Sequence, residues 1–477
     1  MIDLFSRILG ALLPAALSAS GLYLGIYTGL WHPRRLWRGV RMLHSSQAHD
    51  ERANGKGSNT PQTPGERTGR NSPARALALA LAGTLGVGNI AGVSAAIWAG
   101  GAGAVFWMMI SALLATSLKY SETLLGIKHR RRVGGEWHGG APIYIEDAFG
   151  DPARPRRGRL AGRLFALLCI LNAIGMGCMI QVNAAAGALL GSTGLDPQIF
   201  GALMALAVFF IARGGGRRIS SLCGAIVPFI SVGFFILSIA ALILRAGELP
   251  RVLAFILQDA FSFTEDVAGN GGISARIIGG IFGFFTSRAV RSGVSRGLIS
   301  NEAGSGTSPL AHATADTSSA VRQGFMGIAE VIVDTLMLAA ATALVVLTNY
   351  DAAVLYSHDP AMMTIAAYAA ALGEWAVLPL AAAVLLFGAA TVACWAFYAQ
   401  ECIAQLDLGA AARRRAVACF NVIYAASAYI GAVMTAASAW TIADMIIGVM
   451  TMINLAALLA LRREVRMETA AISKKGR

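Results

Sequence analysis

The sequence has little charge. Only 14% of its 477 residues are Asp, Glu, Lys or Arg, whereas 56% are hydrophobic, and the mean hydropathy is +0.61. Soluble domains carry about a quarter of charged residues, so a soluble globular protein is excluded. Apolar runs of roughly 20 residues recur along the chain, which predicts many membrane-spanning helices. A membrane β-barrel would instead show segments of about ten residues with alternating polarity.

The sequence also lacks the residue sets of metal sites and hydrolytic enzymes. It contains no Cys-x-x-Cys pair, no paired carboxylates, no Ser/His/Asp set and no His-Glu-x-x-His motif. The six cysteines fall in or beside apolar runs, as small buried hydrophobes do. We therefore predict that the protein is not an enzyme. The cysteines are Cys169, Cys178, Cys223, Cys394, Cys402 and Cys419.

The net charge of +13 does not indicate nucleic-acid binding, because the cations sit in short connectors between apolar runs. That distribution is the cytoplasmic bias of membrane proteins. Eleven spans with an outside N-terminus place every Arg cluster in the cytoplasm, which predicts a multi-pass protein of the cell inner membrane with a cytoplasmic C-terminus. The expected spans are about 8–30, 76–99, 103–128, 161–190, 197–213, 219–245, 272–300, 321–348, 373–404, 413–433 and 437–461.

The eleven spans divide into one helix and two halves of five. An odd number of spans per half forces the halves to lie inverted in the membrane, which is the recurrent design of secondary transporters. The expected parts are an N-terminal membrane helix (1–32), a cytoplasmic linker (33–75), the first repeat (76–246), an extracellular connector (247–271), the second repeat (272–462) and a cytoplasmic tail (463–477).

The first helix of each half is rich in glycine, which favours a break near mid-membrane; close helix packing is the alternative explanation. Such a break exposes N–H groups that suit a carboxylate and C=O groups that suit sodium. The run Gly83–Asn89 (GTLGVGN) supplies the first break. It fits a dinucleotide-binding fingerprint only loosely, since neither a preceding strand nor a following acidic residue is present.

Further polar residues lie within spans. Thr391 and Gln181 are candidate site residues, although a lone Thr usually bonds its own helix and a Gln can simply join two helices. Lys119 and Glu122, three residues apart, are expected to pair on one helix face. Arg296, with Arg288 and Arg291, could snorkel to the interface or pair with Glu302. Asp334 has no evident partner in the sequence.

Several long motifs resemble those of the alanine/glycine:cation symporter family, also called sodium:alanine symporters. The motifs are Gly83–Val93 (GTLGVGNIAGV), Ala102–Trp107 (AGAVFW), Arg296–Pro309 (RGLISNEAGSGTSP), Ala311–Ala313 and Val321–Gly324 (VRQG). The resemblance runs from about residue 4 to 461. It implies an all-α membrane protein with the five-plus-five inverted repeat of leucine-transporter type, preceded by one extra helix. It also implies sodium-driven uptake of alanine or glycine.

The Gly86–Asn89 stretch is also similar to neurotransmitter:sodium symporters, and this likeness implies individual roles. Gly83, Thr84 and Gly88 would contact the amino acid. Thr84 and Asn89 would bind one sodium ion, and the Ala82 and Leu85 carbonyls with Thr391 would bind another. We further expect Gln181, Gly279, Gly280 and Ile281 to line the substrate pocket, with Ile281 restricting the substrate side chain to hydrogen or methyl. Na+ is the expected coupling ion.

The sequence departs from the family pattern at four positions. Ala390 replaces one of two adjacent hydroxyl residues. Cys178 replaces the usual Asn, Arg288 replaces the usual Gln or Met, and Gln400 replaces the usual Glu.

The predicted function is sodium-coupled symport of a small neutral amino acid by alternating access. The alternatives are a proton-coupled carrier and an uncoupled sensor or channel-like protein. The expected partners are the amino acid, sodium and the lipid bilayer, without nucleic acid.

Overall fold

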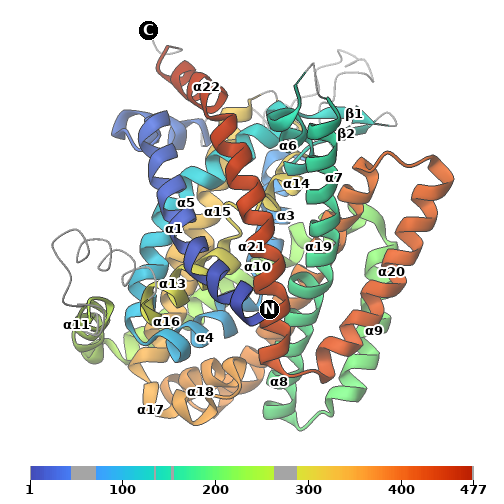
Figure 1. The fold of residues 1–477 in the computed structure, drawn as a ribbon. Helices are drawn as coiled ribbons and strands as arrows, with labels where there is room; N and C mark the ends of the chain where they lie inside the picture. The colour runs from blue at the N-terminus through green and yellow to red at the C-terminus, as the bar shows by residue number, and fades with distance from the viewer. Residues whose placement is uncertain are drawn as a thin grey trace, which may run out of the picture.

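The computed structural model describes residues 2–43, 71–133, 136–151, 155–262, 287–317 and 319–474. It is a helical bundle with one short antiparallel hairpin, formed by β1 (Arg131–Val133) and β2 (Glu136–His138). In this hairpin Arg132 pairs with Trp137. Figure 1 shows the hairpin and α22 at one end of the bundle, and α17 and α18 at the other. By length and composition, 7 of the described helices could each cross a membrane.

The long elements follow the expected spans. They are α1 (Ile2–Thr28), α3 (Pro73–Thr84) with α4 (Ala91–Gly100), α5 (Gly103–Lys128), α7 (Pro155–Asn172) with α8 (Ile180–Thr193), α9 (Pro197–Arg213), α10 (Gly215–Leu244), α13 (Arg288–Asn301), α15 (Ala320–Val331) with α16 (Ala340–Thr348), α19 (Val377–Gln405), α20 (Ala410–Val433) and α21 (Ala436–Ala460). The part of the expected span 272–300 before residue 287 lies outside the described residues.

Shorter helices that the sequence analysis did not predict fill the connectors. They are α6 (Ala141–Phe149), α11 (Leu249–Ala260), α14 (Ser308–His312), α17 (Tyr350–Ala353), α18 (Pro360–Leu372) and α22 (Arg462–Lys474). Residues 33–43, expected as part of a cytoplasmic linker, are helical. The expected tail carries α22, whose Val465 and Thr469 are fully buried. Lys128 of α5 pairs with Glu464 at 3.2 Å, so α22 is docked on the bundle.

Local sequence signals explain where helices begin and end. Proline in the first turn, preceded by a side-chain cap, starts α3 after Ser72, α9 after Asp196 and α18 after Asp359. Gly194, at φ +74°, ends α8 in the left-handed conformation.

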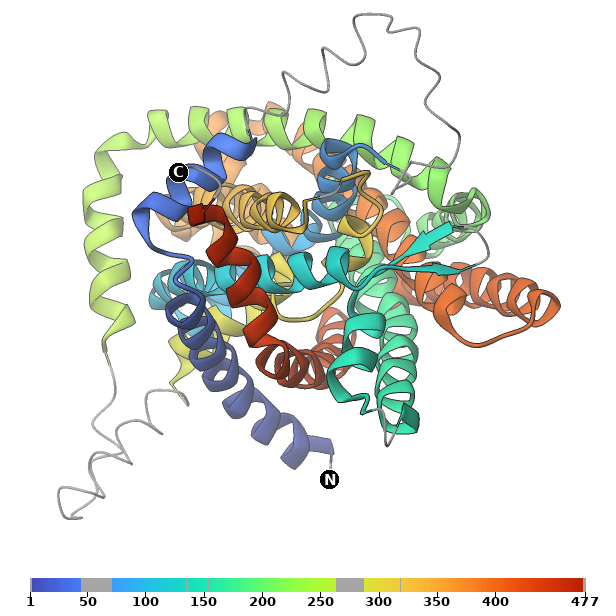
Figure 2. The ribbon, with the colours of Figure 1, turned by 90° about the horizontal axis from the view of Figure 1, so that it is seen from above.

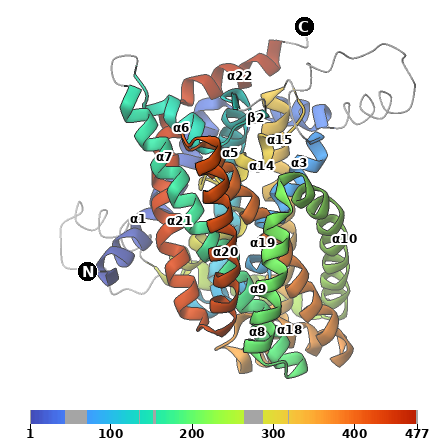
Figure 3. The ribbon, with the colours of Figure 1, turned by 90° about the vertical axis from the view of Figure 1, so that its right-hand side faces the viewer.

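Two spans contain π-helical turns instead of regular α-helix. Residues Ala173–Met179 (η2) join α7 to α8, and Ile332–Ala339 (η5) join α15 to α16. Such turns concentrate at functional sites because they redirect side chains. Viewed from above, α10 and α11 wrap one edge of the bundle (Figure 2), and α9 lies beside α20 on another side (Figure 3).

Candidate functional site: the break between α3 and α4

The helix formed by α3 and α4 is interrupted between Thr84 and Ala91, where the glycine pattern predicted a break. A single 3-10 turn, η1 (Val87–Asn89), fills the gap, and Gly86 before it is extended, at φ −103° and ψ −159°. Leu85 at the end of α3 is fully buried. Backbone polar groups freed inside a membrane protein need partners from neighbouring elements or from ligands.

Gln181 supplies one of these partners. Its Oε1 accepts a 3.0 Å hydrogen bond from the backbone N–H of Val87, and its Nε2 donates to the Met176 carbonyl at 3.1 Å. Gln181 stands just after the π-helical turn η2. The candidate residue Gln181 therefore lies at the break. Its amide oxygen occupies the position in which a substrate carboxylate could accept a hydrogen bond from the Val87 N–H.

Thr391 of α19 contacts the same break. Its Oγ1 donates a 2.8 Å hydrogen bond to the Ala82 carbonyl oxygen, 309 positions earlier in the chain. The hydroxyl therefore bonds another helix, unlike most lone Thr residues in membrane helices. Thr391 and the Ala82 carbonyl, two of the three expected ligands of one sodium ion, are thus in direct contact.

Thr84 and Asn89, the expected ligands of another sodium ion, have different surroundings. Thr84 Oγ1 lies 3.4 Å from the Ala80 carbonyl oxygen of its own helix. Asn89 Nδ2 donates to Asp334 Oδ1 at 2.6 Å, and Asn89 Oδ1 accepts from the Ser300 hydroxyl at 2.6 Å. Asn89 is therefore held between α13 and η5.

The glycines at the break are in close contact with their neighbours. A Cβ on Gly83 would lie 2.7 Å from the Tyr398 hydroxyl, and one on Gly88 would lie 3.5 Å from Ser300 Cα. A Cβ on Gly86 would lie 2.7 Å from both Gln181 Oε1 and Thr391 Oγ1. Gly86 was not among the predicted site residues, although it belongs to the same glycine run.

Three expected substrate-binding residues, Gly279, Gly280 and Ile281, lie outside the described residues.

Asp334 has partners that sequence reasoning missed. Its fully buried carboxylate accepts from Asn89 at 2.6 Å and from Thr335 at 2.7 Å. Oδ2 also lies 2.7 Å from the Ser300 hydroxyl, whose single hydrogen is shared between Asp334 and Asn89 Oδ1. The partners come from η1, α13 and η5 itself. Position in a membrane span was the only signal for Asp334, because its neighbours are set by tertiary packing.

Of the two alternatives expected for Arg296, pairing with Glu302 is wrong. Arg296 does not pair with Glu302: it lies 3.4 Å from Asp444 and stacks over Trp440, with its Cζ 4.3 Å from the ring centroid. Arg288 Nε donates to the Ala99 carbonyl at 3.2 Å.

The expected Lys119–Glu122 pair forms, but a different residue is closer to the ammonium group. Lys119 Nζ lies 3.8 Å from Glu122 Oε1 and 3.2 Å from Glu330 Oε1. Glu330 also accepts from Ser308 at 2.8 Å and contacts His312 Nε2 at 2.9 Å. The side chains of this cluster are all fully buried, and all except Ser308 are ionisable: Lys119, Glu122, Glu330, His312 and Ser308.

A cavity of about 460 Å³ leads toward the break from the end of the bundle that carries α18. Its volume is within the range of small-molecule sites. Exposed residues such as Asp196 and Gln198 line its outer part, and buried Ala91 and Ile180 line its inner part.

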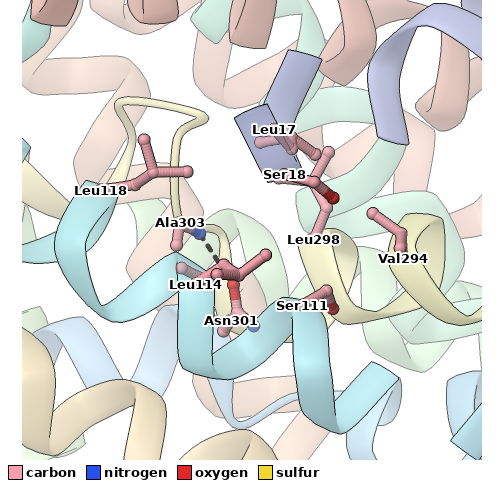
Figure 4. A pocket seen from close by; sticks show the side chains of 10 residues that line it. Leu17, Ser18, Ser111, Leu114, Leu118, Val294, Leu298, Asn301 and Ala303 are labelled. Atoms are coloured by element: carbon pink, nitrogen blue, oxygen red, sulfur yellow. Dashed lines mark hydrogen bonds between the residues drawn. The ribbon is translucent and has the colours of Figure 1, made fainter. Parts of the chain in front are cut away.

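A second cavity, shown in Figure 4, lies between α1, α5 and α13. Its volume of about 10 Å³ would hold at most one water molecule. Leu17, Leu114 and Leu298 line it, and Asn301 Oδ1 at its edge accepts from the Ala303 N–H at 3.0 Å. This cavity is too small and too apolar for an amino acid.

Comparison with known proteins decides the family. The model of the sodium:alanine symporter family matches residues 1–476. The chain belongs to the sodium:alanine symporter family. The family resemblance seen in the motifs is thus confirmed, and this sodium:alanine symporter family member is a multi-pass membrane transporter, not an enzyme.

Curated relatives with similar sequences carry several substrate names. "Sodium/alanine symporter AgcS" of Methanococcus maripaludis is 32% identical over 403 residues, 84% of each chain. "Putative sodium/proton-dependent alanine carrier protein YrbD" of Bacillus subtilis is 30% identical, covering 82% of this chain and 78% of the relative. "Probable sodium/glutamine symporter GlnT" of Bacillus subtilis is 31% identical, covering 83% of this chain and 77% of the relative.

Among solved structures, a similar fold occurs in a Na+-coupled sialic acid symporter, described in a substrate-bound outward-open state. The TM-score is 0.52 at 13% identity, over 88% of this chain and 82% of that chain. At this identity the likeness concerns the fold of this sodium:alanine symporter family member alone.

Proposed function

We propose that the protein carries a small neutral amino acid, alanine or glycine, into the cell together with sodium. The observation that carries this proposal is the contact between Thr391 Oγ1 and the Ala82 carbonyl at the break of the first repeat helix. A hydroxyl and a carbonyl oxygen at 2.8 Å are hard ligands that suit a dehydrated sodium ion. The Leu85 carbonyl, three residues along, would complete the expected set.

The substrate would bind on the other side of the same break. Its carboxylate would accept from the Val87 N–H, with Gln181 moving aside or donating through Nε2. The 460 Å³ cavity supplies a path from the α18 end, which the distribution of Arg clusters assigns to the outside of the inner membrane. The cavity and the break together favour an outward-facing state.

Alternating access would then proceed by closure of this cavity and opening at the opposite end. The membrane potential assists inward sodium movement by about 2.3 kcal/mol per charge per 100 mV. A second candidate, sodium with a larger amide-bearing substrate, is favoured only by the relative named as a glutamine symporter.

Uptake of radiolabelled alanine into proteoliposomes, with and without an inward sodium gradient, tests the proposal. We expect accumulation only with the gradient, and competition by unlabelled glycine. Competition by glutamine but not by glycine would favour the second candidate. Uptake that ignores sodium would overturn the symport proposal.

A further inference from the structure

The segment that joins α13 to α14 holds a buried glutamate in an unusual backbone conformation. Glu302 has φ +53°, and among the described residues it is the only non-glycine residue with a positive φ. Glycine or asparagine tolerates this conformation better. Its side chain is fully buried. A charged residue at such a position points to a function for its carboxyl group.

Among the described residues, the hydrogen-bond partners of the carboxyl group are uncharged. Oε1 accepts from the Trp395 indole N–H at 3.1 Å, and Oε2 lies 2.5 Å from Thr307 Oγ1. The buried cation Lys119 contacts Glu330 and Glu122 instead. An isolated carboxylate without a cation is very unfavourable in such a place.

The hydroxyl groups around Glu302 favour a protonated carboxyl group. The Ser305 hydroxyl donates to the Glu302 backbone carbonyl at 2.5 Å, and a carbonyl can only accept. Ser305 Oγ accepts from the Thr307 N–H at 3.4 Å and also lies 2.8 Å from Thr307 Oγ1. Thr307 has a single hydroxyl hydrogen, which can serve either Ser305 Oγ or Glu302 Oε2. A protonated Glu302 that donates through Oε2 makes both contacts hydrogen bonds, whereas an ionised carboxylate takes the Thr307 hydrogen and leaves two hydroxyl oxygens 2.8 Å apart without one.

The charges nearby act in both directions, because Lys119 favours the ionised form of Glu302 whereas Glu330 and Asp334 favour the protonated form. Glu330 is neutralised by Lys119, and it also accepts from Ser308 and contacts His312. Glu122 Oε2 accepts from the Gly304 and Gly306 N–H groups at 3.2 Å each and from Asn454 at 3.0 Å. The titratable groups that act electrostatically on Glu302, or on which it acts, come from α5, α15, η5 and α19: Lys119, Glu330, Asp334, Cys394 and Tyr398.

We propose that Glu302 is a proton-binding site, which holds a proton while the α14 end of the bundle is closed and loses it when that end opens. On opening, water would reach the carboxyl group, the O–H bond would break, the electron pair would stay on the carboxylate, and the proton would pass to cytoplasmic water. Reclosure would require a proton from the same side. The transport cycle is therefore expected to respond to internal pH, which rests on the proposed transport function and its orientation.

Infrared spectroscopy of the full-length protein in lipid at neutral pH tests the proton directly. We expect a difference spectrum between wild type and Glu302→Gln to contain the carbonyl stretch of one protonated carboxyl, shifted by exchange into D2O. Glu122→Gln is the matched control and should leave that band in place. A difference spectrum that contains only carboxylate stretches would overturn the proposal.

Glu302→Gln should fold, because its amide can donate to Thr307 and accept from Trp395 as the protonated acid does. If it does not fold, Thr307→Val tests the same point, since loss of the acceptor should move the protonated-carboxyl band to higher frequency. An unchanged spectrum in Thr307→Val would contradict the hydrogen-bond assignment.

Uptake at several internal pH values tests proton release. We expect internal acidification to slow wild-type uptake several-fold and to leave Glu302→Gln unaffected. If uptake by the wild type and by Glu302→Gln depends equally on internal pH, the role of Glu302 in the cycle is overturned. Absence of sodium-driven uptake in wild type would defeat the proposed function, and the infrared result would still decide the proton site.

Discussion

Asn89 Nδ2 donates a 2.6 Å hydrogen bond to Asp334 Oδ1, which joins the break between α3 and α4 to the π-helical turn η5. The two residues are 245 positions apart in the chain. The contact places a buried carboxylate beside a residue expected to bind sodium. Replacing Asp334 by Asn removes the negative charge and keeps the shape of the side chain. The variant therefore separates electrostatic attraction of the sodium ion from the effect of packing.

Asp334→Asn should therefore weaken sodium activation of uptake by roughly 10- to 150-fold, since a charged partner contributes about 1.5–3 kcal/mol. The sodium concentration that gives half-maximal alanine uptake is the measurement. Asp444→Asn, which removes the partner of Arg296, is the control and should leave that concentration within about twofold. An unchanged sodium dependence in Asp334→Asn would show that its carboxylate does not act on the ion.

Thr391 provides a second test of the sodium site. Thr391→Ala should raise the sodium requirement roughly 5- to 30-fold, because loss of one ligand costs about 1–2 kcal/mol. Thr391→Ser keeps the hydroxyl and should restore most of the affinity. Equal sodium dependence in the wild type and Thr391→Ala would remove this residue from the ion site.

Gly86→Ala tests the close approach of three elements at the break. The new Cβ would lie 2.7 Å from Gln181 Oε1 and Thr391 Oγ1, so one of them must move. We expect alanine uptake to fall more than about tenfold, the loss that a displacement costing about 1.4 kcal/mol would give. Gly233→Ala in α10 is the matched control, since its Cβ meets nothing within 4 Å. Comparable uptake by the two variants would contradict a close-packed break.

Lys119 tests the buried ion pairs. Lys119→Met leaves Glu330 without its cation and should destabilise the protein by about 3–5 kcal/mol. The midpoint of thermal unfolding in detergent is the measurement. Lys128→Met on the same helix removes partly exposed pairs with Glu464 and Glu468, and should cost less than about 1 kcal/mol. Equal midpoints for the two variants would show that the buried pair does not stabilise the fold.

Orientation in the membrane can be tested by cysteine labelling. Among the described residues, Cys419 is exposed and the other five cysteines are buried, so Cys419→Ser gives a suitable background. A membrane-impermeant maleimide should label Gly247→Cys in intact cells, and Gly409→Cys only after permeabilisation. Both glycines have open space around them. The reverse labelling pattern would place the N-terminus in the cytoplasm.

The sequence was sufficient to predict the long helices and the break at Gly83–Asn89, because hydrophobic runs and glycine clusters are local features. The short helix α18 has a recognisable start signal in its capping Asp359 and first-turn Pro360, but at 13 residues it is too short to be predicted from hydrophobic runs that span a membrane. Docking of α22 could not be predicted, since it depends on burial of Val465 and Thr469 against distant helices.

The site was harder to predict than the fold. Thr391 and Gln181 were identified as polar residues in apolar spans, and both contact the break. The partners of Asp334, Arg296 and Glu302 could not be inferred, because each pair joins elements that only tertiary packing brings together. The left-handed backbone at Glu302 likewise has no signal in an otherwise ordinary stretch of small residues.

Sodium-driven alanine uptake by the purified protein in proteoliposomes tests the central claim most directly. The account predicts that an inward sodium gradient drives accumulation of radiolabelled alanine, and that this accumulation is lost when sodium is replaced by potassium or choline. Equal alanine uptake with and without a sodium gradient would contradict it.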